Sequence, residues 1–279
     1  MSSVRKSALL LSVGVSLIAL SACQGSARRE NLAYVDKPVE QLYNEAARSL
    51  DRRLWDQAAL QFNEVQRQHP YSEWAQRSML MASYARYRDG SYADAVSGAE
   101  GYIALYPGGE GAAYAYYLIG ISHFEQIIDV GREQGRSELA LVALNEVVRR
   151  FPTSEYARDA ELKVDMVRDQ LAGKEMSIGR YYLRNAEYLA AINRFKRVID
   201  EYETTTHTPE ALHRLVEAYL SVGLEGQALA AASVLGYNYP GSDWYADSYA
   251  LMTDRGLKPE TAPEGDEKGW FSKMWNRMF

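Results

Sequence analysis

The sequence predicts an all-α protein, a solenoid of five helix-pair repeats. Apolar residues between positions 38 and 256 recur at the three- and four-residue spacing of amphipathic helices. Proline or glycine interrupts this pattern at regular distances, as expected where short turns join helices. Small residues also recur at fixed places in each period, which favours internal repeats over the alternative of an irregular helical bundle.

Residues 1–22 have the three regions of an export signal. Arg5-Lys6 precede an apolar run from Ala8 to Leu20, and Leu20-Ser21-Ala22-Cys23 closes the segment. This ending is typical of a lipobox, because lipoprotein processing requires a small residue before the cleaved bond and a thiol after it. The apolar run is too short for the roughly 20 residues that span a bilayer. We expect cleavage before Cys23 and lipidation of its thiol; a signal peptide with a coincidental cysteine is the alternative.

Residues 23–37 are expected to form a lipid-proximal tether. Gln24 stands where many lipoproteins retained in the inner membrane carry Asp, so the default expectation is sorting to the outer membrane. The chain is then held at the periplasmic face of that membrane by its lipid. Cys23 is the only cysteine, which excludes an internal disulfide and a cysteine zinc cluster.

The solenoid is expected over residues 38–256. Its units lie at about 39–72, 76–109, 113–154, 172–205 and 209–242. The third contains an insertion near Ile128 to Arg136, the fourth has Glu203 in place of a closing proline, and a further helical stretch from Glu155 to Leu171 lies between these two units.

Each unit carries Ala, Ser or Gly at its eighth and twentieth places, apart from Val216 in the last unit. Small side chains there let the two helices of a unit approach closely. One unit cannot cover its own apolar face, but stacked units cover each other. Cap signals precede three helices, at Ser72-Glu73, Ser154-Glu155 and Thr208-Pro209-Glu210. The pattern resembles tetratricopeptide repeats.

The C-terminal residues change character twice. Residues 257–268 are polar with two prolines and predict a flexible linker. Residues 269–279 predict an amphipathic helix that needs a docking partner, since about ten residues are marginal as an isolated helix. We favour a groove on another protein over a membrane surface, with the chain's own last repeat as the alternative. The apolar stripe of this helix consists of Trp270, Phe271, Met274, Trp275, Met278 and Phe279.

Charge and motifs argue against nucleic-acid binding and catalysis. The 31 basic and 37 acidic residues give a formal net charge of -6, which does not suit a partner bound through its phosphates. The four histidines have no metal-site spacing, and the sequence contains no nucleotide-binding loop or nucleophile elbow. We expect no enzymatic activity, no metal and no cofactor.

Several junction sequences resemble the BamD family, the tetratricopeptide lipoproteins of the machinery that inserts β-barrel proteins into the bacterial outer membrane. The resemblance runs from Cys23 to about Ala232; Glu203 and the C-terminal extension depart from it. The segments that carry it are His69-Pro70-Tyr71-Ser72, Phe151-Pro152-Thr153-Ser154-Glu155-Tyr156, Arg168-Asp169-Gln170-Leu171-Ala172, Tyr181-Tyr182 and Ala191-Ile192-Asn193-Arg194.

The resemblance implies a scaffold with several partners. Its C-terminal repeats dock on the last periplasmic (POTRA) domain of the barrel-forming subunit, and its N-terminal repeats receive unfolded outer-membrane protein clients. Other assembly lipoproteins belong to the same machinery. Arg194 matches the family's interface arginine. It precedes core residue Phe195, so we expect it to be exposed and able to pair with a partner carboxylate, and Arg197 extends the patch.

The family's clients end in an aromatic-rich strand, which directs attention to tyrosine and tryptophan in the first units. Ring faces with hydrogen-bonding tips suit such a client. We expect a client groove on a shared helical face, with packing between units as the alternative role. The candidate residues are Tyr71, Trp74, Tyr84 and Tyr87.

Two other functions stay open at this point. A periplasmic repeat protein can regulate peptidoglycan enzymes or cell division, and a hidden hydrolase is a third class. The stretch from Glu155 to Leu171 and the context of Arg194 favour the assembly scaffold.

Overall fold

The computed structural model describes residues 37–127, 135–259 and 267–278. The chain divides into two units, Met1–Lys37 and Pro38–Phe279, and the second contains all the described helices. Cys23 with its lipobox, nearly all of the expected tether, most of the expected insertion and Phe279 lie outside the described residues.

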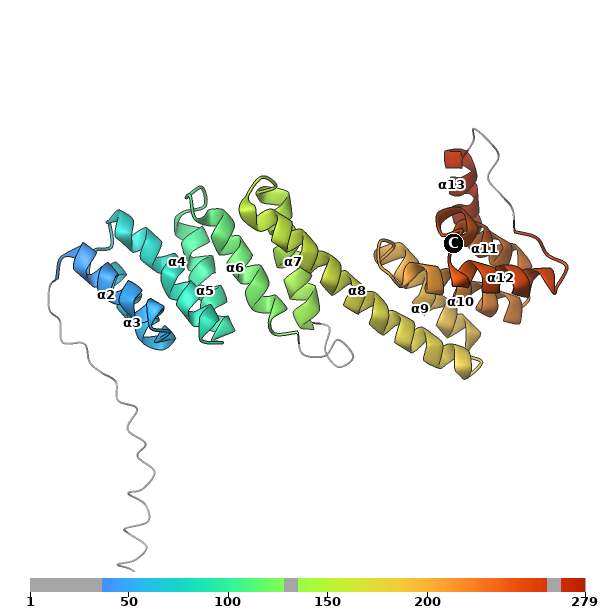
Figure 1. Ribbon diagram of the computed structural model, residues 1–279, viewed down its shortest axis with the longest axis horizontal. Helices are drawn as coiled ribbons and strands as arrows, with labels where there is room; N and C mark the ends of the chain where they lie inside the picture. The colour runs from blue at the N-terminus through green and yellow to red at the C-terminus, as the bar shows by residue number, and fades with distance from the viewer. Residues whose placement is uncertain (1–36, 128–134, 260–266, 279) are drawn as a thin grey trace, which may run out of the picture. The chain divides into compact units, whose positions relative to one another are not determined.

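Every regular element in the described ranges is an α-helix (Figure 1). The helices are α2 (Val39–Asp51), α3 (Trp55–Gln68), α4 (Glu73–Arg88), α5 (Tyr92–Leu105), α6 (Ala112–Phe124), α7 (Gly135–Arg150), α8 (Glu155–Arg184), α9 (Tyr188–Glu201), α10 (Thr208–Ser221), α11 (Glu225–Asn238), α12 (Asp243–Thr253) and α13 (Glu267–Met278). Among them, none is both long enough and apolar enough to cross a membrane.

The helices form five consecutive pairs, from α2 with α3 to α10 with α11. From α2 to α11, each helix packs on the next one in the chain, and the first helices of successive pairs also touch each other. These contacts between sequence neighbours define a repeat solenoid. The predicted fold class, an all-α tetratricopeptide-like solenoid with five helix pairs, is confirmed. Helix α12 then packs on α10 and α11, where the first helix of a further pair would lie.

The two helical stretches expected on either side of residue 171 form one continuous helix. α8 extends for 30 residues, contacts α6 and α7, and also contacts α9 and α10 (Figure 1). Gly173 does not break it. A Cβ at this position would lie 3.0 Å from Nε2 of His207, so the missing side chain leaves room for the turn before α10.

The expected helix caps are only partly present. The Ser72 hydroxyl accepts a hydrogen bond from the Ala75 amide at 3.1 Å and caps α4. Ser154 makes no such bond at the start of α8. Our expectation for Thr208 was wrong, because its hydroxyl lies inside the first turn of α10 and donates to the Glu203 carbonyl at 2.9 Å.

Small residues let the helices of a pair approach closely. Ala46, Ala58, Ala140 and Ala191 are fully buried at these contacts. The helices approach even more closely at two glycines. A Cβ at Gly120 would lie 2.7 Å from Leu144 Cδ2, and one at Gly179 would lie 2.4 Å from Phe195 Cε1. Hydrogen is therefore the only side chain that fits at these two positions without a shift of the Leu144 or Phe195 side chain.

The C-terminal helix docks on its own chain. α13 packs against α11, and Trp270, Met274 and Met278 are buried in the same core as that helix. The Tyr219 hydroxyl of α10 donates to the Met278 carbonyl at 3.0 Å. Our preference for a groove on another protein is therefore corrected: the structure has the self-docked alternative, with Trp275 partly buried against the same core. The Phe271 side chain lies outside the described residues.

Substitution of Gly179 tests the close approach of α8 and α9. We expect Gly179→Ala to destabilise the chain by about 1–3 kcal/mol, because the added methyl group would overlap the Phe195 ring. Gly226→Ala is the control, since nothing lies within 4 Å of its Cβ position, and it should stabilise the chain by about 0.5–1 kcal/mol. Urea unfolding followed by circular dichroism measures both, and equal effects would contradict the packing argument.

Candidate protein-binding surfaces

Arg194 and Arg197 lie on α9 and share one carboxylate. Nη1 of Arg194 donates to Oε2 of Glu175 at 3.0 Å, and Nη1 of Arg197 donates to Oε1 of the same residue at 3.3 Å. Nε of Arg197 also donates to Glu201 at 3.1 Å. The arginine side chains are 36% and 41% exposed, whereas that of Glu175 is 2% exposed.

This geometry arises from the amphipathic pattern of α9. Ala191, Phe195 and Val198 are fully buried, which leaves the two arginines at the edge of the buried face. Arg194 was expected to be exposed; it is partly exposed, and its pairing with Glu175 was not foreseen.

Glu175 has a signal in the sequence that we did not use. It lies four residues after Leu171 and four before Gly179, on the buried face of α8. A carboxylate buried among apolar neighbours requires a charged or hydrogen-bonding partner. That requirement points to the cations on the helix that packs against this face.

The four aromatic residues expected to share a client groove do not lie together. Tyr71 is fully exposed in the turn before α4. Trp74 packs on Tyr43 of α2, with ring centroids 4.6 Å apart, and the Arg77 guanidinium lies 5.8 Å from its ring. The single shared face is therefore corrected, because Trp74 faces the preceding helix pair.

Tyr84 and Tyr87 lie further along α4 and approach α6. The Tyr84 hydroxyl accepts a hydrogen bond from Arg88 at 2.8 Å, and the Tyr87 hydroxyl donates to Glu125 at 3.3 Å. Burial and the Glu125 carboxylate raise the pKa of Tyr87 to about 12. Burial first, and then Tyr84, raise the pKa of Tyr114 on α6. Tyr87 and Tyr114 therefore stay protonated at neutral pH, and Tyr87 acts as a hydrogen-bond donor to Glu125.

The same row of rings continues onto α8. Tyr156 stacks on Tyr117 at 5.2 Å between centroids and lies 5.3 Å from Tyr114. The Tyr117 hydroxyl donates to Asp159 at 2.5 Å, and Lys163 donates to the same carboxylate at 2.8 Å. We call this set the aromatic row; it consists of Tyr84, Tyr87, Tyr114, Tyr117 and Tyr156.

Three members of the aromatic row were missed by the sequence analysis, although a signal was present for two of them. Counted from the start of their units at Gln76 and Ala113, Tyr84 and Tyr87 take the ninth and twelfth places, and Tyr114 and Tyr117 the second and fifth. These places lie three or four residues apart, on one stripe of a first helix. Superposing the two units would have brought the four tyrosines together. Tyr156 gave no such signal.

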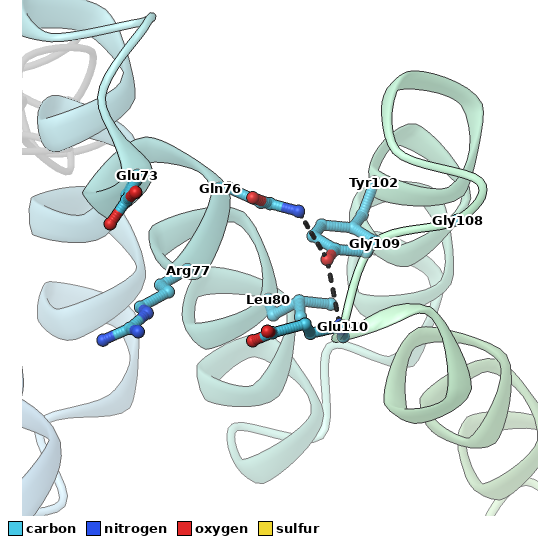
Figure 2. Close-up of a pocket in the computed structure, with 9 residues that line it drawn as sticks. Glu73, Gln76, Arg77, Leu80, Tyr102, Gly108, Gly109 and Glu110 are labelled. Carbon is cyan, nitrogen blue, oxygen red and sulfur yellow. Dashed lines mark hydrogen bonds between the residues drawn. The ribbon is translucent and has the colours of Figure 1, made fainter.

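A polar hollow of about 490 Å³ lies between α4 and the turn before α6 (Figure 2). The Gln76 side chain points toward the Tyr102 hydroxyl in this view and donates a hydrogen bond to it at 3.0 Å. The backbone amide of Gly111 donates to the same hydroxyl at 3.2 Å. A Cβ at Gly109 would lie 2.7 Å from that hydroxyl, so the glycine turn closes tightly on the ring.

The charges around this hollow do not suit a phosphate. Glu73 and Glu110 contribute two carboxylates against the single guanidinium of Arg77. Anion sites require an excess of positive charge or of backbone donors. In the described ranges, no three His, Cys, Asp or Glu side chains gather as they would around a metal ion.

Comparisons with known proteins match this chain to one family. A family model described as outer membrane lipoprotein (YfiO) matches residues 35–235. The chain is 54% identical over 255 residues to the outer membrane protein assembly factor BamD of Caulobacter vibrioides, covering 91% of this chain and 84% of that protein. It is 44% identical to the BamD of Rickettsia prowazekii, covering 77% of this chain and 86% of the relative.

Among solved structures, the chain is similar to a thermophilic TPR protein of Thermus thermophilus. The identity is 18% and the TM-score is 0.37, with 77% of this chain and all of that chain covered.

Proposed function

Because this chain belongs to the BamD family of outer membrane protein assembly factors, we propose that it is a non-enzymatic scaffold of the β-barrel assembly machinery. The observation that carries the proposal is the pair of partly exposed arginines on α9. Binding, not catalysis, is what such a surface supplies, and the solenoid offers further surfaces for other partners.

The arginine pair is proposed to bind the last periplasmic domain of the barrel-forming subunit. Guanidinium groups recognise carboxylates through charge-assisted and often paired hydrogen bonds. Arg194 uses Nη1 in its bond to Glu175, and the groups on Nε and Nη2 are not engaged by that carboxylate. Leu189 lies on the same helix with its side chain 69% exposed.

The aromatic row is proposed to receive unfolded clients. Its tyrosines come from α4, α6 and α8, the first helices of neighbouring pairs that touch one another. An extended client with aromatic side chains would find ring faces for stacking and, at Tyr84 and Tyr87, hydroxyl groups for hydrogen bonds. Trp74 and Tyr71 lie apart from this row and are proposed as peripheral contacts at most.

The chain is proposed to be held at the periplasmic face of the outer membrane by lipid on Cys23. The family of outer membrane lipoproteins supports this placement, and Leu20-Ser21-Ala22-Cys23 supplies the small residue and the thiol that processing requires. Companion lipoproteins are further proposed partners.

The arginine interface is tested by binding of the purified chain to the periplasmic region of the barrel-forming subunit. Arg194→Ala should weaken binding by about 1.5–3 kcal/mol, the usual range for a hydrogen bond to a charged group. Arg149→Ala on α7 is the control, because Arg149 is more exposed and pairs only with Glu146 of its own helix. Calorimetry measures both affinities. Equal binding by wild type and Arg194→Ala would exclude this interface.

Client binding is tested with a peptide that ends in an aromatic-rich strand. Tyr87→Ala should weaken the peptide's affinity by about 0.5–1.5 kcal/mol through the loss of one aromatic contact. Tyr249→Ala on α12 removes a more exposed tyrosine away from the aromatic row and should leave the affinity unchanged. Fluorescence anisotropy of a labelled peptide gives both values, and a Tyr87 variant that binds as wild type would count against the groove.

Lipidation is tested by metabolic labelling with a clickable palmitate analogue. Cys23→Ser should abolish labelling and release the chain from membranes, because serine lacks the thiol that accepts the diacylglycerol. Ser26→Ala is the control and should keep both label and membrane association. Labelling of the Cys23 variant would disprove the assignment.

A further inference from the structure

The side chains of Arg194 and Arg197 meet on the buried carboxylate of Glu175, a residue on another helix. Each carboxylate oxygen accepts from one guanidinium, at 3.0 and 3.3 Å. We propose that Glu175 is a positioning residue that fixes both guanidinium groups for a carboxylate-bearing partner. This inference rests on the proposed role of the arginine pair in binding the barrel-forming subunit.

The burial of Glu175 makes the arrangement specific. Its neighbours along the buried face of α8 are apolar or small, including Leu171, Met176 and Gly179. An ionised carboxylate there is favourable only with charged partners at hydrogen-bonding distance. Since the Glu175 side chain is 2% exposed, its two oxygens have a fixed position. The hydrogen bonds to these oxygens in turn fix the positions of both guanidinium groups.

Fixed guanidinium groups have an advantage in binding. A long side chain that is mobile before association loses rotamer entropy when a partner immobilises it. Arg194 and Arg197 are already held at Nη1, and Arg197 is held again at Nε by Glu201. Nη2 of both residues is engaged by neither glutamate, so donors are left for a partner.

The opposing explanation is that Glu175 only neutralises charge inside the chain. The two explanations predict opposite signs for Glu175→Gln, which removes one negative charge but keeps the shape of the side chain. If charge alone governs binding, the arginine surface becomes more positive and an acidic partner binds more tightly, most clearly at low salt. If positioning governs, Arg194 loses its charged anchor, Arg197 keeps only Glu201, and binding weakens.

Glu210→Gln provides a matched control. Glu210 of α10 is also a mostly buried carboxylate shared by two arginines, Arg180 of α8 and Arg214 of α10. Its side chain is 14% exposed, and neither of its arginines lies on α9. The control reproduces the loss of a shared internal ion pair without disturbing the proposed interface.

The experiment measures binding of the full chain to the purified periplasmic region of the barrel-forming subunit at low and moderate salt. Glu175→Gln should bind at least about tenfold more weakly at both salt concentrations, which corresponds to about 1.4 kcal/mol. Glu210→Gln should bind as wild type. Circular dichroism and thermal melting establish that both variants are folded under the conditions of the assay.

A second readout separates positioning from stability. Nitrogen relaxation of the arginine Nε–H groups in the unbound chain should show greater mobility of Arg194 in Glu175→Gln than in wild type. In an Arg194→Ala, Arg197→Ala background, Glu175→Gln should have no further effect on binding.

The possible failures are distinguishable. Unchanged or tighter binding by a folded Glu175→Gln, with Arg194→Ala still weakened, would overturn the positioning role and leave the interface standing. Wild-type affinity in Arg194→Ala would overturn the interface and this inference with it. Unaltered mobility of the Arg194 Nε–H group in Glu175→Gln would also overturn the positioning role.

Discussion

The close approach of the two helices in each pair is the constraint on which the rest of the structure depends. Gly120 and Gly179 leave no room for a methyl group against Leu144 and Phe195. Alanine and serine take the corresponding place in the first two units. When the two helices are this close, the second helix covers the apolar face of the first, and the next helix pair covers the apolar surface that stays exposed. An added methyl group at Gly120 or Gly179 would have to displace the Leu144 or Phe195 side chain on the partner helix.

The same closeness governs the polar groups that lie between helices. Water is excluded there, so a buried carboxylate must find its partners on the neighbouring helix. Glu175 meets Arg194 and Arg197 in this way, and Glu210 meets Arg180 of α8 in addition to Arg214 of its own helix. The arginine side chains in these ion pairs are partly exposed, whereas both glutamates are mostly buried. The packing that stabilises the solenoid therefore also fixes the cations that a partner would meet.

The sequence predicted the features that depend on local periodicity. It did not predict the contacts that depend on which helix faces pack against each other. The fold class followed from small residues repeated at fixed places, because these report a contact within each unit. The pairing of Glu175 joins residues in two helices, and the docking of α13 on α11 joins segments separated by a linker. Neither contact has a spacing of its own in the sequence. The client residues show the same limit: Trp74 and Tyr87 are on one helix, yet Trp74 contacts Tyr43 of α2 and Tyr87 bonds to Glu125 at the end of α6.

α8 connects the two candidate surfaces by a rigid element. Tyr156, in the aromatic row, and Glu175, which anchors the arginine pair, are both on this continuous helix. At a rise of about 1.5 Å per residue they are about 28 Å apart along its axis. A flexible joint would let the two surfaces vary in separation, whereas an unbroken helix keeps the distance set. Gly173 lies between them and weakens the helix by its freedom. The approach of His207, which a larger side chain at this position would obstruct, is the physical reason for glycine there. Gly173 thus leaves room for the turn before the last helix pair without breaking α8. A client bound to the aromatic row and a subunit bound to the arginine pair would therefore be held at a constant distance from each other.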